Sequence, residues 1–307
     1  DLVETPEGEW YAVHLCGRAL QRRILCQKDT EAPVGDKFAG GRRYMIGRET
    51  AIQKMKWTED GWLVLACGGN MPQDEVEMPE RGKASRTDEV LGTGEIPETY
   101  APLIRDDFDE TKLYLDYQSL RVPMDDRHIS LTARPGWLRM YGRSGLASKF
   151  SQTLIARRMT EYQMKAAACM EFEPEVFKQM AGLILMYDTD NYLYLYISYD
   201  EDIGKCITLL KAENKKYEYL VDYIPVEQGK AIYLKLELNW GEVQFFYGYE
   251  EKELQKIGAC IDVDFLSDEA CNEGWFTGTM IGICCQDLTG DGKYADFDWF
   301  EVRAVTA

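Results

Sequence analysis

Residues 231–249 read AIYLKLELNWGEVQFFYGY, and this stretch decides the fold class. Apolar residues take every second position from Ile232 to Leu238, and tyrosine, lysine and glutamate stand between them. Because successive side chains of a β-strand point to opposite faces, this alternation predicts a strand with one buried face. The turn-like residues Asn239–Glu242 follow, and a second alternation starts at Val243. The stretch therefore predicts an antiparallel β-hairpin.

The same pattern of short alternating strands recurs to the end of the chain. Residues 192–197 (YLYLYI) and 217–223 (YEYLVDY) place tyrosines at alternate positions, and residues 188–191 (DTDN) and 289–292 (TGDG) are typical of turns. Many short strands with regular turns predict a two-sheet antiparallel β-sandwich or jelly roll over residues 103–307. The tyrosine stripes could form a platform on which sugars stack, but cross-strand packing is the favoured interpretation.

The first part of the chain alternates short apolar runs with glycine-rich breaks. Residues 10–15 (WYAVHL) and 62–65 (WLVL) predict strands. From residue 72 to 102 the composition shifts to Pro, Glu, Gly, Lys and Thr, which is typical of a linker. The sequence therefore predicts a first domain over residues 1–80, a linker over 81–102 and the sandwich over 103–307.

The apolar strand faces should form the core of each part, because burial of apolar surface drives folding. In the first part we expect Trp10, Val13, Trp57, Trp62 and Leu65 to be buried. In the sandwich we expect burial of Leu193, Leu195, Leu234, Leu236, Trp240, Phe245 and Trp299.

Composition excludes several classes of protein. The 35 Lys and Arg residues against 53 Asp and Glu give a net charge of −18, which argues against binding to nucleic-acid backbones. No apolar stretch approaches the ~20 residues of a membrane helix. The first residues, DLVET, show neither the basic region nor the apolar segment of a signal peptide. The nine cysteines are irregularly spaced and form no Cys-x-x-Cys pair, so we expect reduced, mostly buried thiols in a cytoplasmic protein.

Catalytic motifs are missing from the sequence. It contains no Gly-x-Ser-x-Gly elbow, no Walker loop and no His-Glu-x-x-His motif. Of the two histidines, His14 lies in an apolar strand and should be a hydrogen-bonded core residue, whereas His128 follows a polar run and should face solvent. The residues alone therefore describe a soluble all-β protein without a specific chemistry.

A resemblance to a known family adds what the residues alone do not. Residues 9–18 (EWYAVHLCGR), 46–53 (IGRETAIQ) and 57–62 (WTEDGW) resemble the last propeller blade of glycoside hydrolase family 43, in its β-xylosidase and α-L-arabinofuranosidase branch. The segments that resemble the concanavalin-like β-sandwich of that branch are 106–109 (DDFD), 130–136 (SLTARPG), 181–183 (AGL), 276–278 (FTG), 285–287 (CQD) and 295–298 (ADFD). The resemblance implies an all-β chain in which a remnant of a five-bladed propeller precedes the sandwich.

The resemblance also implies a function and a missing part. Members of this branch release terminal xylose or arabinofuranose from xylan-derived oligosaccharides, with inversion by an acid and a base roughly 6.5–9.5 Å apart. Their three catalytic carboxylates lie in earlier blades, so no catalytic residue is expected in this chain, and the chain alone should be inactive. The alternative is a non-catalytic carbohydrate-binding or interaction module.

Two residues of this chain are implied to bind the substrate. Arg48 matches the arginine beside the catalytic carboxylates, although a surface contact with Glu49 would also explain it. Phe276 matches the aromatic residue that walls the sugar pocket, although Trp275 could be that ring, and either could belong to the core.

Asp107 and Asp298 match a carboxylate pair that shares a structural Ca²⁺ in sandwiches of this type. Capping of turns by these aspartates is the alternative. Because one blade normally buries its faces against its neighbours, we also expect a partner. That partner is a chain carrying the missing blades, the sandwich, or a second copy in a homo-oligomer.

Overall fold

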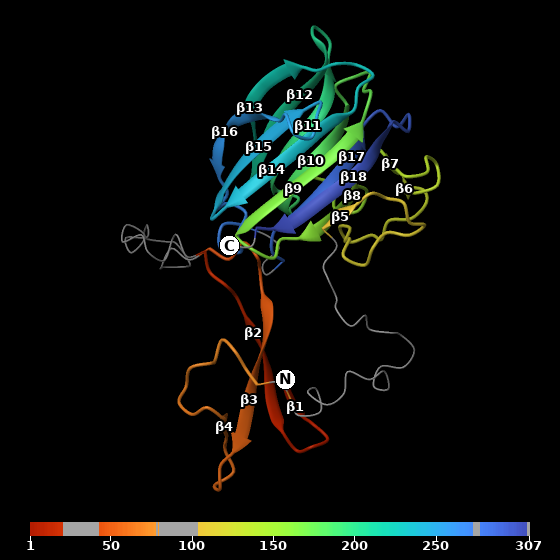
Figure 1. Cartoon of the computed structure of the whole chain (residues 1–307). Coiled ribbons are helices and arrows are strands. Elements are labelled where there is room, and N and C mark those ends of the chain that lie inside the picture. The colour runs from red at the N-terminus through yellow and green to blue at the C-terminus, as the bar shows by residue number, and fades with distance from the viewer. Residues whose placement is uncertain (21–42, 78, 80–103, 273–276, 306–307) are drawn as a thin grey trace. The chain divides into compact units, whose positions relative to one another are not determined.

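The chain folds into two compact all-β units. The structure, a computed structural model, describes residues 1–20, 43–77, 79, 104–272 and 277–305 (Figure 1). Every regular element in these ranges is a β-strand, as the sequence predicts. The first unit comprises Asp1–Arg18 and Arg48–Pro102, and the second comprises Ala19–Gly47 and Leu103–Ala307. The described residues include no helix long and apolar enough to span a membrane.

The first unit is one four-stranded antiparallel sheet in the order β1-β2-β3-β4. Its strands are β1 (Leu2–Glu4), β2 (Trp10–Cys16), β3 (Glu49–Trp57) and β4 (Leu63–Leu65). The strands predicted around residues 10–15 and 62–65 are thus present. A four-stranded sheet of sequential strands is the form of a propeller blade.

The predicted core of this first unit is wrong. Trp57 and Trp62 are 51% and 70% exposed, and Trp10, Val13 and Leu65 are only half-buried. The reason is that the described elements of this unit make a single layer, and one sheet cannot bury both of its faces.

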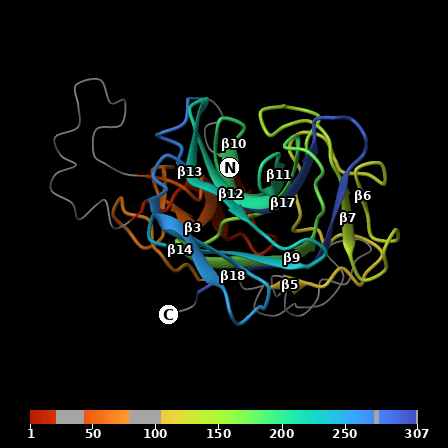
Figure 2. The same cartoon turned by 90° about the horizontal axis from the view of Figure 1, so that it is seen from above.

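The second unit is a sandwich of two antiparallel sheets. The six-stranded sheet has the order β13-β12-β11-β10-β17-β8, and the eight-stranded sheet has the order β16-β15-β14-β9-β18-β7-β6, with β5 also paired to β18. Figure 2 shows the two layers, with β12 and β17 in one and β9, β14 and β18 in the other. The strands are β5 (Arg105–Asp106), β6 (Ile129–Ser130), β7 (Leu138–Tyr141), β8 (Thr153–Arg158), β9 (Gln163–Glu171), β10 (Gln179–Asp188), β11 (Asn191–Asp200), β12 (Gly204–Glu213), β13 (Lys216–Pro225), β14 (Ile232–Asn239), β15 (Glu242–Gly248), β16 (Gln255–Asp262), β17 (Met280–Asp287) and β18 (Tyr294–Ala304).

The core of the sandwich lies between these two sheets, as predicted. The predicted leucines and Phe245 are fully buried in this core. Trp299 is also buried, at 3% exposure, but outside the core cluster and under the Arg105 guanidinium. Trp240 is only partly buried, because it lies in the turn after β14, where its φ is 48°, and not within a strand. Its ring stacks on the Tyr162 ring, with the centroids 5.9 Å apart. The hairpin predicted from residues 231–249 is formed by β14 and β15, which pair from Tyr233 opposite Gly248 to Asn239 opposite Glu242.

The tyrosine stripe of β11 faces away from this core but is also buried. Tyr192, Tyr194 and Tyr196 are at most 3% exposed and form a second hydrophobic cluster with residues such as Leu154 and Ile184. The Tyr194 and Tyr196 rings stack with their centroids 4.6 Å apart. This stripe therefore serves packing and offers no open platform for a ligand.

Removal of core volume should destabilise the sandwich strongly. We expect Leu195→Ala to lower the free energy of unfolding by about 2–5 kcal/mol, because Leu195 is fully buried between the sheets. The matched control is Leu115→Ala at a side chain that is 99% exposed, where the change should stay within about 0.5 kcal/mol. Urea unfolding followed by circular dichroism measures both, and equal losses would contradict this description of the core.

Candidate functional site

A short segment between β2 and β3 belongs to the sandwich unit. Met45 and Ile46 are buried within the core cluster of that unit. The Thr279 N–H donates to the Met45 carbonyl at 2.7 Å, and the Tyr44 N–H donates to the Glu269 carboxylate at 2.9 Å. The sequence places these residues inside the first domain, but backbone hydrogen bonds attach them to the loop that precedes β17.

Arg158, at the end of β8, joins this segment to the same loop. Its Nη1 donates to the Thr277 carbonyl at 2.8 Å and to the Ile46 carbonyl at 3.3 Å. One guanidinium therefore satisfies a carbonyl from each segment.

Two glycines allow the two segments to come together. Gly47 and Gly278 have φ of 78° and 75°, a region that residues with a side chain rarely adopt. A Cβ atom on Gly47 would lie 2.6 Å from the Gly278 nitrogen, and one on Gly278 would lie 2.2 Å from the Ile46 carbonyl oxygen. The backbones are thus in direct contact, and neither position has room for a side chain.

This contact lies next to both predicted substrate-binding residues in the chain. Arg48 directly follows Gly47, is half-buried, and immediately precedes β3. Phe276 stands two residues before Gly278 and, like Trp275, lies outside the described residues. The Glu49 carboxylate accepts two hydrogen bonds from Arg18, at 2.8 and 2.9 Å, so Arg18 is one of its partners.

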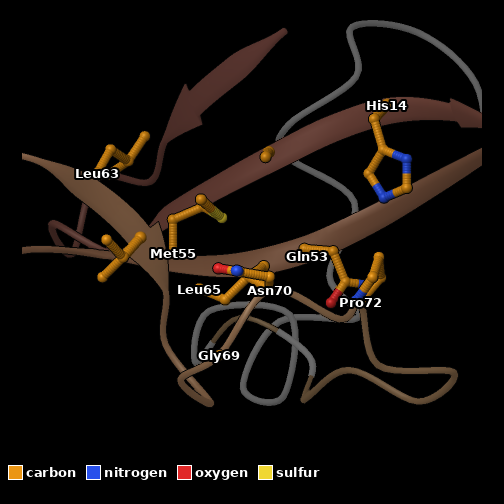
Figure 3. Close-up of a pocket in the computed structure, with 10 residues that line it drawn as sticks. His14, Gln53, Met55, Leu63, Leu65, Gly69, Asn70 and Pro72 are labelled. Atoms are coloured by element: carbon orange, nitrogen blue, oxygen red, sulfur yellow. The ribbon is translucent and has the colours of Figure 1, made fainter.

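The first unit has a hollow of about 430 Å³ on one face of its sheet (Figure 3). Gln53 lines this hollow and is held in place, because its side-chain amide donates a hydrogen bond to the Gln73 carbonyl at 2.8 Å and accepts one from the Gln73 N–H at 2.9 Å. His14 also lines it, with Nδ1 3.2 Å from the Leu15 carbonyl oxygen. The described residues that line the hollow are Ala12, His14, Gln53, Met55, Leu63, Val64, Leu65, Gly69, Asn70 and Pro72, and none of these carries a carboxyl group.

The environment of both histidines differs from expectation. His14 is half-buried, and its buried Nε2 has no hydrogen-bond partner among the described residues, so it is not the satisfied core residue that was predicted. His128 is only 6% exposed rather than solvent-facing. Its Nδ1 accepts the Asp125 N–H at 3.3 Å, and burial together with the nearby Arg143 cation lowers the pKa of His128. Both conditions favour the neutral imidazole.

Asp107 and Asp298, the predicted calcium pair, lie within electrostatic reach of one another. Burial raises the pKa of Asp298, the Arg105 cation opposes this rise, and the Asp107 carboxylate adds to it. Arg105 Nε donates to Asp107 Oδ1 at 2.8 Å, and the guanidinium lies over the Trp299 ring, 4.0 Å from its centroid.

This carboxylate pair can stabilise a cation, and Arg105 already supplies one. Within the described ranges no group of three or more His, Cys, Asp or Glu side chains could hold a metal ion. A Ca²⁺ ion prefers six to eight oxygen ligands, so backbone carbonyls would have to complete the set. The pair therefore fits calcium only in part, and the calcium site stays a prediction.

Comparison with known proteins decides the family. Residues 105–303 match the family described as "Beta xylosidase C-terminal Concanavalin A-like domain", which covers most of the sandwich. The chain belongs to glycoside hydrolase family 43. The fold predicted from the sequence, a propeller remnant followed by a concanavalin-like sandwich, is thereby confirmed.

Family 43 relatives match nearly the whole chain. The Xylosidase/arabinosidase 43B of Humicola insolens is 34% identical over 314 residues, and the Beta-xylosidase of Bacillus subtilis is 32% identical over 309 residues. They match 99% and 98% of this chain but only 52% and 53% of their own lengths. The solved xylan β-1,4-xylosidase of Bacillus halodurans has a TM-score of 0.82 and 37% identity, over 98% of this chain and 52% of that one. The chain thus spans about half the length of the relatives it matches.

The glycine contact should be sensitive to a single methyl group. We expect Gly278→Ala to destabilise the sandwich by about 1–3 kcal/mol more than Gly290→Ala, because only the former drives a Cβ into backbone atoms. Gly290 is the matched control, since it has φ of 84° but nothing within 4 Å of an added Cβ. Chemical unfolding of both variants measures the difference, and an equal loss would show that the close approach of Gly47 and Gly278 is not part of the folded state.

Proposed function

We propose that this chain is the C-terminal part of an exo-acting, inverting glycoside hydrolase that releases terminal xylose or arabinofuranose from xylan-derived oligosaccharides. Its family and the names of its relatives support the substrate class. The share of those relatives that it covers supports its being one part of a larger enzyme. The acid and base then belong to the other part, and the chain alone is inactive.

The observation that carries this proposal is the contact between Gly47 and Gly278. It fixes Gly47, directly before Arg48 in the sequence, against Gly278, which stands two residues after Phe276 in the sequence. If Arg48 or Phe276 served only for local packing, the backbones at Gly47 and Gly278 would not need to approach so closely that neither position has room for a side chain.

Each residue would have a distinct role in the sugar pocket. Arg48 supplies a fixed cation, which keeps a neighbouring catalytic carboxyl ionised and donates hydrogen bonds to substrate hydroxyls. Phe276 supplies an apolar wall that excludes water and limits the pocket to a terminal sugar. Neither side chain can protonate a leaving oxygen or activate a water molecule, so both act only with the missing carboxylates.

The partner of this chain is the part that carries the missing blades, as a longer precursor or a separate polypeptide. The first unit supports this, because its large exposed apolar side chains would be covered by neighbouring blades. These side chains are Leu2, Val3, Leu15, Ile52, Trp57, Trp62 and Met71, each at least 44% exposed. A second copy of the chain in a homo-oligomer is the other occupant that such a surface allows.

We place the protein in the cytoplasm. Each of the eight cysteines within the described ranges carries a free thiol, and five of them are buried. Burial raises the pKa of buried thiols such as Cys169 and Cys284, in each case to about 12, so they are unreactive.

Activity should depend on the missing part. The chain alone should hydrolyse aryl β-xylosides at background rate, because the loss of a general acid or base costs about 10²–10⁴-fold each. Addition of the missing blades, as a fusion or a complementing fragment, should restore turnover. Xylosidase activity of the purified 307-residue chain, with contamination excluded, would contradict this assignment.

In the restored enzyme the two substrate-binding residues should have separable effects. Arg48→Ala should lower kcat/KM mainly through kcat, because charge and orientation at the carboxylates are lost, whereas Phe276→Ala should mainly raise KM. Leu115→Ala, at a fully exposed position, is the control and should leave both constants unchanged. If both variants behave like this control, the two residues lie outside the sugar pocket.

We also propose that Asp107 and Asp298 hold a structural Ca²⁺ together with backbone carbonyls. Saturation with calcium at about 100 times its dissociation constant should then stabilise the sandwich by about 2.7 kcal/mol, and a chelator should remove this gain. Asp298→Asn should abolish the response, and Asp222→Asn, at an exposed position on β13, should retain it. Identical melting with calcium and with chelator would show that Arg105 is the only cation that the pair needs.

A further inference from the structure

A groove of about 640 Å³ lies at one end of the sandwich, and its lining includes none of the residues implicated so far in hydrolysis. Its lining comes from β7 and the loop before it, from the end of β9 and the loop after it, from the first residue of β10, and from the turn before β18 and the first residues of β18. Arg139, Asp296 and Glu171 stand directly opposite one another on the three adjacent strands β7, β18 and β9. All of these residues belong to the second unit, so the groove is complete within the sandwich.

Charged side chains in the groove are held in a fixed row. Arg139 makes two hydrogen bonds to Asp296, at 2.7 and 2.8 Å, and the Asp296 side chain is only 6% exposed. Arg134 bridges Glu171 and Asp296 at 2.7 and 3.2 Å. Bidentate pairs of this kind fix both partners geometrically, so donors and acceptors are preorganised along the row.

An exposed aromatic ring adjoins this row. Tyr294 is 43% exposed, and the Arg139 guanidinium lies 3.8 Å from its ring centroid. Tyr141 packs against it in an edge-on arrangement at 6.3 Å. The ring is therefore fixed by its neighbours while much of it still faces water, unlike the buried tyrosines of β11.

The charge balance of the groove selects among ligands. Its lining contains three basic and five acidic residues, so phosphates and uronic acids would be repelled. The basic residues are paired with carboxylates, Lys293 with Glu175 at 2.7 Å among them, so each of the three cations in the lining already has a carboxylate partner and none is left for a small anion. A neutral ligand with many hydroxyl groups can instead accept from the guanidinium groups and donate to the carboxylates.

We propose that this groove is a second, non-catalytic binding site for a neutral oligosaccharide. The apolar C–H face of a pyranose would stack on Tyr294, and its hydroxyls would bond Arg134, Lys293 and Glu171. The groove volume lies within the range of about 300–1,000 Å³ that is usual for small-ligand sites. The class of ligand follows from the groove itself, and the choice of a xylose-based chain rests on the proposed function.

Titration of the 307-residue chain with xylotetraose, by calorimetry or NMR, tests this site. We expect a dissociation constant on the order of 1 mM or tighter. Tyr294→Ala should weaken binding about tenfold or more, and Tyr294→Phe should retain most of it, because stacking needs only the ring. Tyr217→Ala is the matched control, since Tyr217 is 53% exposed but lies on β13, at the edge of the other sheet.

The outcomes separate this site from the catalytic one. No binding at about 10 mM xylotetraose, or equal binding by Tyr294→Ala, overturns the proposal. Loss of binding in Arg48→Ala with full binding in Tyr294→Ala also overturns it, because the sugar would then occupy the substrate pocket. Tighter binding of oligogalacturonate or of tetralysine would overturn the neutral class. A failure to restore hydrolysis with the missing blades would reject the proposed function but leave Tyr294-dependent binding unaffected.

Discussion

The close approach of Gly47 and Gly278 is the constraint on which the organisation of this chain depends. Two backbones that meet without side chains allow the segment before β3 to join the sandwich, where Met45 and Ile46 enter the core. The chain therefore passes from the first unit into the second, returns, and enters the second again. Residues 19–47 belong to the second unit, and the chain leaves the first unit at Arg18 and re-enters it at Arg48. The contact thus joins the segment directly before β3 to a loop more than 200 residues further on.

The sandwich supplies the stability on which this constraint rests. Its two sheets bury alternate residues of nearly every strand in one continuous core, and the second face of β11 is buried as well. The first unit has only one sheet, and its Trp57 and Trp62 stay exposed at 51% and 70%. Burial of apolar area is the main favourable term in folding, so the sandwich is self-sufficient in a way that the single sheet is not.

Several basic side chains of the sandwich lie beside carboxylates in the same way. Arg105 faces Asp107 and Asp298, Arg134 and Arg139 face Glu171 and Asp296, and Lys205 faces Glu173 at 2.7 Å. Each cation lies beside acidic groups on a neighbouring strand or loop, which offsets part of the strong negative charge of the chain. Three of these cations, Arg105, Arg134 and Arg139, also lie over aromatic rings. Charged and aromatic side chains are therefore neighbours on the outer face of the eight-stranded sheet.

The sequence by itself determined the strands, the fold class and the family. Strand periodicity is local, so the alternation in residues 231–249 correctly predicted β14 and β15, and motifs such as IGRETAIQ carried the family resemblance. Which faces are covered depends on layers that are remote in sequence. The same alternation therefore failed for Trp57 and Trp62, and a polar run wrongly placed His128 in solvent. Only the tertiary structure attached Met45 and Ile46 to the sandwich, through contacts with a loop more than 200 residues further on. It also aligned Arg139, Asp296 and Glu171, because strand pairing brings together residues such as Arg139 and Asp296, which are 157 positions apart in the sequence.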